Sequence, residues 1–426
     1  MLGFWNFPIT GAQIRFRSPL FIEGGFPMSS RIVKITLEVK APARQVYEAF
    51  TNATLMRGWF SDVASVDAQY GKRLYLYWNS GYDVCGEYTS LEKDKSICFT
   101  WKGRGEPGTS QVKISLKPRR NKTILTLTHR VPSASQKWQK ALAGFKEEWP
   151  NVLGNLVSVL ETGQDLRITR RPMLGIFFGD FNPAIAEKLC VPVQEGIRLE
   201  GIVDGMGAQT AGLQKDDVIV CIDEKIIATY LDLGNVIQPH HAGDKIAVTY
   251  YRGSEKRSTT MILSPRVLPE IHTRAGDLVE ALRRLYAEID SELVKCFGGA
   301  TEEQASHSPA PGEWSAKEVL AHLIHGERDT HGWINDMVSY QERVSDGYAD
   351  NYPGRIKATV GVYQTYQELL KELSRNEAET VAMLAALPED FLARKGSFWR
   401  LSYVLINSPQ HAQAHYSQIR SAIAST

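Results

Sequence analysis

Several features that would place a 426-residue chain in a functional class are missing from this sequence. Charge of one sign is the first, since 49 Lys and Arg oppose 48 Asp and Glu and leave a net charge of +1. A near-neutral chain lacks the basic footprint of a nucleic-acid binder or of a protein held on an anionic membrane. No run of about 18 apolar residues occurs either, which predicts no transmembrane helix. Nucleic acid and membrane are therefore not expected as partners.

Cysteine is scarce and scattered. No CxxC pair occurs and no spacing suggests a disulfide framework or a thiolate zinc site. Each of the five lies in an apolar run, which predicts small buried side chains: Cys85, Cys98, Cys190, Cys221 and Cys296. This usage indicates a reducing compartment, and we expect a cytoplasmic protein.

The first residues carry no recognisable targeting segment. Residues 1–29 have aromatic side chains but no apolar stretch behind a basic start. The segment M-S-S-R-I-V-K-I-T at Met28 reads as a natural beginning, so we interpret 1–29 as an N-terminal extension or a mis-called start. The length as a whole is too great for one hydrophobic core and predicts two to four domains.

Residues 30–163 are predicted to form an α+β unit. The segment I-V-K-I-T-L-E-V at 32–39 alternates as a half-buried strand does, and five more short alternating segments follow between 73 and 129. From Ser133 the period becomes helical. One apolar stripe follows this helix: Trp138, Leu142, Phe145, Trp149, Val152, Leu156, Val159 and Leu160. A helix with such a stripe must lie across the sheet.

The words A-P-A-R-Q-V-Y-E-A-F-T, M-R-G-W-F and T-L-T-H-R in this unit resemble the START-like (SRPBCC) superfamily, in its branch related to activators of a heat-shock ATPase. The resemblance implies a helix-grip fold, a role in stress response, and a space between helix and sheet that holds an apolar ligand or a client protein. Five aromatic residues would line that cavity: Trp59, Phe60, Trp78, Trp101 and Trp149. The alternative is that the rings simply fill the core, because large aromatics dominate core packing.

Residues 172–265 carry a second pattern. Three segments occur in order: P-M-L-G-I, E-G-I-R-L-E-G-I-V-D-G-M-G-A-Q-T-A-G-L-Q-K-D-D-V-I-V-C-I-D and H-A-G-D-K-I-A-V-T-Y-Y-R-G-S. Together they resemble a bacterial PDZ domain of the kind attached to HtrA-type proteases. A short basic linker, D-L-R-I-T-R-R-P, precedes it. The chain lacks a G-x-S-x-G elbow or a similar nucleophile motif, so we do not expect a protease. Asp216 and Glu224 stand where the family has glycine, which predicts strained turns.

The PDZ resemblance implies that protein C-termini or extended peptides are partners. An extended peptide would add to a sheet edge while backbone N–H groups receive its terminal carboxylate. Leu174, Gly175 and Ile176 are the expected donor positions, and Leu233 and Ile237 on the following helix are expected to form an apolar pocket. The alternative is a PDZ fold that serves only as a spacer.

Residues 270–426 are helical by period, and four amphipathic helices with one long crossover predict a bundle. The expected helices span about 274–296, from Ser315 onward, about 362–387, and from Ser408 onward. Ser315 with Glu318 forms the pattern of a capping box, and Ser408 is expected to cap the last helix.

Five of the ten histidines lie on two of these helices. H-A-Q-A-H places His411 and His415 one turn apart on one face, and His322 lies in the apolar context V-L-A-H-L-I, which directs it toward the core. Histidines on helices are more often solvated or satisfied in the core, but three convergent imidazoles would suit a metal with open positions. His325 is the alternative ligand, and His331 is expected at the cavity mouth or the surface.

The words E-W-S-A-K-E-V-L-A-H-L and H-A-Q-A-H-Y-S-Q-I resemble the DinB superfamily. The resemblance implies His322, His411 and His415 as ligands of a divalent metal, and we expect Zn²⁺ or Ni²⁺. It also implies a low-molecular-weight thiol as a partner, because the family includes metal-dependent thiol transferases.

The overall expectation is a multidomain α+β protein. It would be a cytoplasmic binding protein that joins a START-like ligand or client module, a peptide-binding PDZ module and a metal-binding bundle. The alternative is a thiol S-transferase that acts on electrophilic small molecules.

Overall fold

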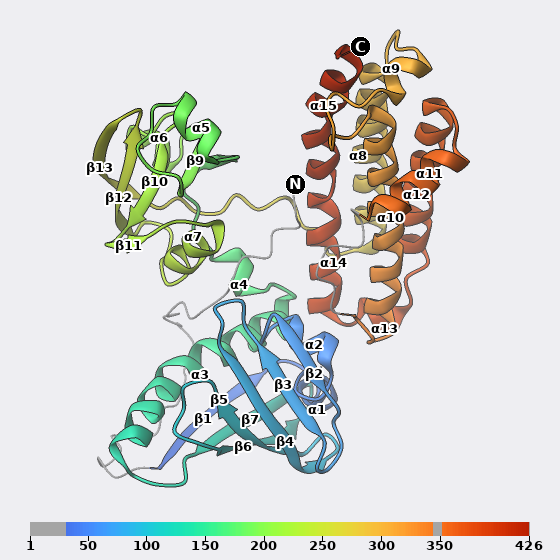
Figure 1. Cartoon of the computed structure of the whole chain (residues 1–426). Coiled ribbons are helices and arrows are strands. Elements are labelled where there is room, and N and C mark those ends of the chain that lie inside the picture. Colours follow the sequence, from blue (N-terminus) through green and yellow to red (C-terminus); the bar gives the residue numbers. More distant parts are fainter. Residues whose placement is uncertain (1–30, 344–351, 426) are drawn as a thin grey trace. The chain divides into compact units, whose positions relative to one another are not determined.

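The computed structural model describes residues 31–343 and 352–425. The N-terminal extension predicted at 1–29 lies outside the described residues. Three separate hydrophobic cores occur in the described ranges, one in each of the three predicted modules. The mixed α+β class is confirmed: a sheet crossed by a long helix, a β-rich middle region and a helical C-terminal region (Figure 1). Contacts divide the chain into two compact units that meet between Leu268 and Pro269.

The first region is a seven-stranded antiparallel sheet with strand order β1-β7-β6-β5-β4-β3-β2. Its strands are β1 Ile32–Val39, β2 Val63–Val66, β3 Arg73–Tyr77, β4 Asp83–Glu92, β5 Ser96–Gly103, β6 Ser110–Arg119 and β7 Lys122–Arg130. Two short helices, α1 Ala43–Ala49 and α2 Ala53–Arg57, connect β1 to β2. The sequence did not predict α2 or β2, because a five-residue helix and a four-residue strand are too short to show a period.

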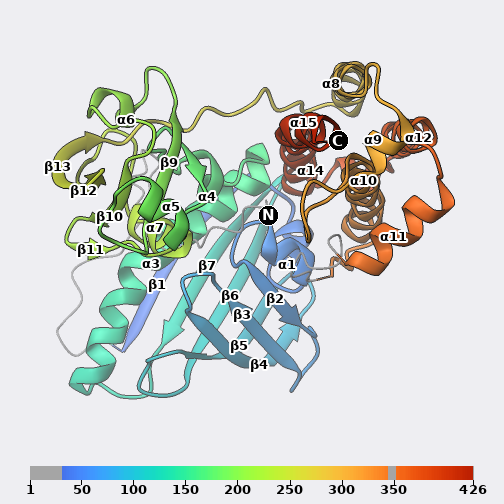
Figure 2. The same ribbon diagram turned by 45° about the horizontal axis from the view of Figure 1, so that its top comes forward.

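The long helix α3, Gln136–Thr162, crosses one face of this sheet (Figures 1 and 2). Six of the eight residues of the predicted apolar stripe are buried, whereas Val152 and Leu160 are only partly buried and Leu153 is buried in addition. Pro150 lies inside the helix. The stripe and the inward residues of the sheet together form the core of the region.

The first half of the expected basic linker after α3 packs against the first region. It forms a short helix, α4 Leu166–Thr169, capped by the Asp165 side chain. Asn155 of α3 donates to the Trp59 carbonyl at 2.7 Å and to Asp165 at 2.9 Å, and it accepts from the Leu166 N–H at 2.7 Å. Arg167 binds Asp165 and donates to the Arg57 carbonyl at 2.7 Å. These bonds hold α4 on the first region.

The second region is a six-stranded sheet with order β13-β12-β10-β9-β8, in which β11 pairs with β10. Its strands are β8 Ile176–Gly179, β9 Ile197–Ile202, β10 Val218–Ile222, β11 Lys225–Ile226, β12 Lys245–Arg252 and β13 Glu255–Ile262. The helices are α5 Pro183–Lys188, α6 Gly207–Thr210 and α7 Tyr230–Ile237. Asp216 and Glu224 have φ of 69° and 66°, in the left-handed region that favours glycine, as their turns predicted. β8 is an edge strand.

The C-terminal region is a helical bundle, which Figure 2 shows with α8, α10, α12 and α15 nearly end-on. Its helices are α8 Ala275–Cys296, α9 Glu302–Ser306, α10 Ala316–Val338, α11 Pro353–Val362, α12 Tyr366–Ala385, α13 Glu389–Leu392, α14 Lys395–Asn407 and α15 Pro409–Ala424. The capping box of Ser315 and Glu318 is present. The expected third helix is α12, which begins at Tyr366 after its Thr365 cap, and α11, which ends at Val362, was not predicted.

Two local predictions were wrong. Ser408 does not cap α15: it has helical angles because α14 runs into α15 end to end, as Figure 1 shows. Of the five cysteines expected to be buried, Cys296 is buried, Cys98 and Cys221 are half-buried, and Cys85 and Cys190 are exposed. Cys85 lies at an exposed position of β4, and Cys190 lies in a turn with φ of 54°. All five cysteines are free. None of the helices in 31–343 and 352–425 has the length and apolar character needed to cross a bilayer.

Candidate metal centre and peptide-binding edge

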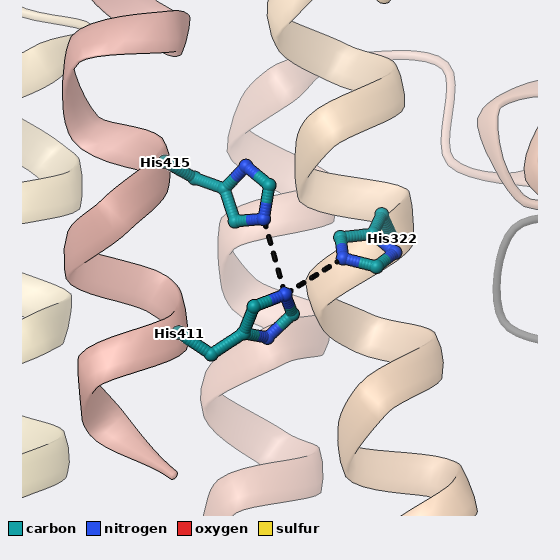
Figure 3. A group of neighbouring side chains, drawn as sticks. All are labelled: His322, His411 and His415. Atoms are coloured by element: carbon teal, nitrogen blue, oxygen red, sulfur yellow. Dashed lines mark hydrogen bonds between the residues drawn. The ribbon is translucent and has the colours of Figure 1, made fainter. Parts of the chain in front are cut away.

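Two helices of the bundle bring the three predicted histidines together (Figure 3). His322 comes from α10, and His411 and His415 come from consecutive turns of α15. The Nε2 atom of His411 lies 3.0 Å from that of His322 and 3.1 Å from that of His415. All three ligand atoms lie within 4.8 Å of one another. His322 and His415 are buried and His411 is half-buried.

The surroundings of the triad fix its chemistry. The Nδ1 atom of His415 lies 2.7 Å from the Gln418 amide oxygen, so Nδ1 carries the proton and Nε2 presents a lone pair to the triad. The Trp314 ring packs 5.0 Å from the His322 ring. Burial, with the His415 charge as a second cause, lowers the pKa of His411 to about 4. Burial also lowers the pKa of His415. Near pH 7 the imidazoles of His411 and His415 are therefore neutral, the form that ligates a metal.

The donor set fits a divalent metal. Three imidazole nitrogens held by one tetrahedral ion at about 2.0–2.1 Å would lie roughly 3.3 Å apart, close to the two separations seen. Without an ion, converging lone pairs repel one another, and a single N–H can satisfy only one neighbour. The structure therefore contains a histidine cluster that can hold a metal ion.

The other two helix-borne histidines are engaged elsewhere. His325 is buried, and its Nε2 atom lies 2.9 Å from the Thr359 hydroxyl of α11. The Nε2 atom of His331 lies 2.9 Å from the Thr380 hydroxyl and 3.1 Å from the Asn376 carbonyl, both on α12. His331 is half-buried between α10 and α12. Neither residue belongs to the cluster.

Sequence reasoning missed Gln418, the partner of His415. It lies three residues after His415, and the i, i+3 spacing on one helix places the two side chains together. That spacing was visible in H-A-Q-A-H-Y-S-Q.

The expected carboxylate-binding loop leads into β8. Gly175 has φ of 81°, and a Cβ atom there would lie 2.2 Å from the Met206 Cβ, so only glycine fits. The Leu174 carbonyl accepts from the Ala208 N–H and the Gly175 carbonyl accepts from the Val203 N–H. Within the described ranges, neither the Leu174 nor the Gly175 N–H has a hydrogen-bond partner. These two donors are left available at the edge of the sheet.

Leu233 and Ile237, expected to form the apolar pocket, lie on the buried face of α7 with 2% and 3% exposure. Both pack in the core of the PDZ-like region together with Ile176. Tyr230 and Leu231 are the exposed large residues of this helix.

The five aromatic residues expected around a ligand cavity form one packed cluster. Trp59 stacks on Phe60 with ring centroids 4.7 Å apart, and Phe60 lies 5.7 Å from Trp149. Trp78 and Trp101 complete it, at 5.5 and 6.2 Å from Phe60. Trp78 is half-buried and the other four are buried. The rings thus contact one another between the sheet and α3.

A buried histidine lies beside this cluster. The Nδ1 atom of His129 accepts from the Trp149 indole N–H at 3.0 Å, and its Nε2 atom lies 2.7 Å from the Ser110 hydroxyl. The Phe145 ring stacks on it at 3.9 Å. Burial lowers the pKa of His129 to about 3, so the ring is neutral near pH 7. It joins β6, β7 and α3.

Three family models match the chain in order. Residues 40–161 match Activator of Hsp90 ATPase homolog 1-like protein, residues 172–263 match the PDZ domain, and residues 280–419 match the DinB superfamily. The chain thus contains a START-like, a PDZ and a DinB domain, as the sequence predicted.

The curated relatives are HtrA-like. A "Serine protease Do-like HtrA" of Lactococcus lactis subsp. cremoris is 32% identical over 119 residues, which is 27% of this chain and 28% of that protein. A do/HhoA-like protein of Haemophilus influenzae, whose name describes a periplasmic serine protease, is 31% identical over 114 residues, 26% of this chain and 24% of that protein. The chain thus spans about a quarter of the length of these relatives.

Two solved structures match part of the chain. The Aha1 dimer from Colwellia psychrerythraea is 20% identical and covers 30% of this chain and 96% of its own, with a TM-score of 0.27. An HSP90 activator from Plasmodium falciparum is 28% identical and covers 29% of this chain and 97% of its own, with a TM-score of 0.25.

Proposed function

We propose that this chain is a cytoplasmic multidomain binding protein whose DinB domain holds one divalent metal ion through His322, His411 and His415. The observation that carries the metal assignment is the convergence of three imidazoles on one point. Imidazole ligands suit Zn²⁺ and Ni²⁺, and the geometry of the site would choose between them. Three protein ligands leave at least one coordination position for water or a thiol.

Elemental analysis of protein purified without an affinity tag, followed by titration of the metal-free protein with Zn²⁺ or Ni²⁺ at pH 7.5, tests this assignment. We expect about one ion per chain, and His415→Ala should lower the affinity at least 100-fold by removing one of three ligands. His331→Ala is the matched control, because that imidazole is also helix-borne but faces Thr380 and Asn376. No metal in the purified protein and none bound on addition would contradict the proposal.

The PDZ domain, in this proposal, binds free protein C-termini that end in an apolar residue. The available N–H groups of Leu174 and Gly175 at the edge of β8 support this. A terminal carboxylate would accept from them, with Ile176 as the third expected donor, whereas an amide lacks the charge. Leu233 and Ile237 would contribute to the floor beneath the last side chain. Binding of free acids and amides of the same peptide, measured by fluorescence anisotropy, tests it: equal affinities would contradict it.

The START-like domain is proposed to bind an apolar small molecule or a client protein. An apolar ligand is supported by the aromatic cluster of Trp59, Phe60, Trp78, Trp101 and Trp149. A ligand that displaced one of these rings would replace the lost ring contact with its own contact to the neighbouring rings. Quenching of tryptophan fluorescence by a panel of apolar molecules, compared between wild type and Trp78→Phe, tests it. The proposed location in the cytoplasm rests on the five free cysteines and is tested by cell fractionation.

A second candidate function is supported by the open position at the histidine cluster. A bound divalent ion would lower the pKa of a low-molecular-weight thiol and hold it as the thiolate. The chain would then be a thiol S-transferase that acts on an electrophilic small molecule. Loss of an alkylating probe that requires both metal and thiol, and is absent in His415→Ala, would support this function. Full metal binding without any thiol-dependent turnover would exclude it and leave the binding role intact.

A further inference from the structure

The edge strand β8 sets the direction in which a peptide would run. Ile176 lies opposite Ile202, and the Gly175 carbonyl accepts from the Val203 N–H. This is the pattern of a non-hydrogen-bonded pair, so the backbone groups of Ile176 point away from β9 to the open edge. A strand that adds antiparallel to β8, with its carboxylate at residues 174–176, therefore runs past Phe178 and reaches Asp180 upstream.

Tyr230 marks the far end of this edge. Its hydroxyl donates to the Gly179 carbonyl at 3.1 Å, and its ring packs against Phe178 with centroids 5.2 Å apart. Because Tyr230 is the first residue of α7, this contact ties that helix to the last residue of β8. A bound peptide would separate from β8 at the position of Tyr230.

Two carboxylates lie at the same end. Asp180 follows β8 directly, and Glu200 lies on β9, where its Cβ atom would be 3.2 Å from a Cβ atom placed on Gly179. Both side chains are exposed, and their charges help to raise the pKa of the Tyr230 hydroxyl, an effect secondary to its burial. Neither carboxylate forms an ion pair within residues 31–343 and 352–425.

A cation beside these carboxylates is already neutralised. Arg198 binds Asp216 at 2.7 Å, and it also donates a 3.5 Å hydrogen bond to the Asp180 backbone carbonyl. Arg198 thus stands with three carboxylates: Asp216, Asp180 and Glu200. This end has a negative potential that a positive residue of a peptide would complement.

We infer that the β8 edge selects C-terminal peptides that carry Lys or Arg about four residues upstream of the carboxylate. Asp180 lies four positions after Ile176, and an added strand advances at about the same rise per residue as β8 itself. This inference rests on the proposed peptide-binding function and adds the charge of the partner to it. It assigns Asp180 and Glu200 as specificity residues, with Tyr230 marking where selectivity begins.

The test uses the full chain and four versions of one synthetic peptide that ends in valine. The fourth residue upstream is Lys or Glu, and each version is made as the free acid and as the amide. We expect the Lys acid to bind about 3- to 10-fold more tightly than the Glu acid at low salt, as for partly exposed charge pairs. The difference should shrink in 0.5 M NaCl because salt screens exposed charges.

Variants of the chain locate the effect. The double substitution Asp180→Asn with Glu200→Gln should bring the Lys-to-Glu ratio close to one. Glu255→Gln is the control, because it removes one carboxylate charge, against two in the double variant, from the β12–β13 hairpin at the opposite edge of the sheet. Melting temperatures of all variants check that the domain remains folded.

The outcomes separate the two proposals. If both acids bind better than their amides but with equal affinity, the charge inference is wrong and carboxylate binding stands. If the Glu255→Gln variant loses the selectivity as fully as the double variant, the effect is one of overall charge and the assignment to Asp180 and Glu200 is wrong. If no acid binds better than its amide, carboxylate recognition fails and the inference fails with it.

Discussion

Two groups of buried imidazoles in this chain are arranged in opposite ways. His129 in the START-like domain has a partner for each ring nitrogen, the indole of Trp149 and the hydroxyl of Ser110. The Nε2 atoms of His322, His411 and His415 in the DinB domain instead face one another. Burial lowers the pKa of both His129 and His411, so both are neutral near pH 7.

The difference shows that burial and a lowered pKa do not by themselves identify a functional histidine. What distinguishes the two groups is whether the chain supplies complementary partners. Both ring nitrogens of His129 have partners, and removing the ring leaves the Trp149 indole N–H without its acceptor and the Ser110 hydroxyl with the Trp101 carbonyl alone. The DinB cluster turns three ring nitrogens toward one another, an arrangement that a bound cation would complete. The first arrangement predicts a structural role, the second a ligand-binding role.

Replacing His129 with Ala should produce the largest effect. The Trp149 indole N–H loses its acceptor, the Ser110 hydroxyl loses one of its two partners, and a cavity opens beneath Phe145. We therefore expect a loss of about 3 kcal/mol or more in the stability of the START-like domain. Urea unfolding, followed by hydrogen exchange of β6 and β7 peptides in the full chain, measures it. A loss below about 1 kcal/mol would show that His129 is not the tie between sheet and helix that its contacts suggest.

Adding metal should affect only the other domain. An ion that binds the folded bundle alone stabilises it by about 2.7 kcal/mol at 100 times its dissociation constant. Hydrogen exchange of α10 and α15 should slow on addition of the ion, and that of β6 and β7 should not change. Without the ion the bundle should remain folded, because its apolar core contains none of the three ligands. Equal slowing in both domains would contradict a site at the histidine cluster.

Acidification should weaken the START-like domain whether or not metal is present. The pKa of His129 is about 3 in the folded chain and about 6.5 when unfolded, so the unfolded state binds the proton more readily. This contribution to stability is complete above pH 6.5 and is lost as the pH falls toward 3, by about 2 kcal/mol at pH 5. Exchange of β6 and β7 between pH 7.5 and 5, corrected for intrinsic rates, reports it. His129→Ala should flatten the slope, and an unchanged slope would assign it to other groups.

The smallest expected effect is that of Gln418, which orients His415 from outside the cluster. Gln418→Leu should weaken metal binding about 10-fold, since loss of an outer hydrogen bond to a ligand typically costs 10- to 100-fold. Gln413→Leu is the matched control, an exposed glutamine on the same helix with no contact to the cluster. Isothermal titration of the metal-free variants compares them. An equal effect of both substitutions would remove Gln418 from the site.

The regular elements were largely predictable because their signals are local. The alternating pattern predicted a strand from Ile32 to Val39, which are the bounds of β1 in the structure, and the capping box at Ser315 located the start of α10. The limits of local signals are equally clear at Ser408, where a serine before proline suggested a new helix. Only packing along the whole bundle keeps the chain helical through that position.

The sequence by itself determined which side chains can take part in the metal cluster, because the i, i+4 spacing of His411 and His415 on a helix faces them the same way. The segments that resemble the DinB superfamily then indicated His322, which lies 89 residues before His411. Tertiary structure alone decided that His129 meets Trp149 and Ser110, that α4 docks on Asn155, and that Asp180 and Glu200 gather beside Tyr230. These contacts join segments with no common period, so their energies appear only once the chain has folded around them.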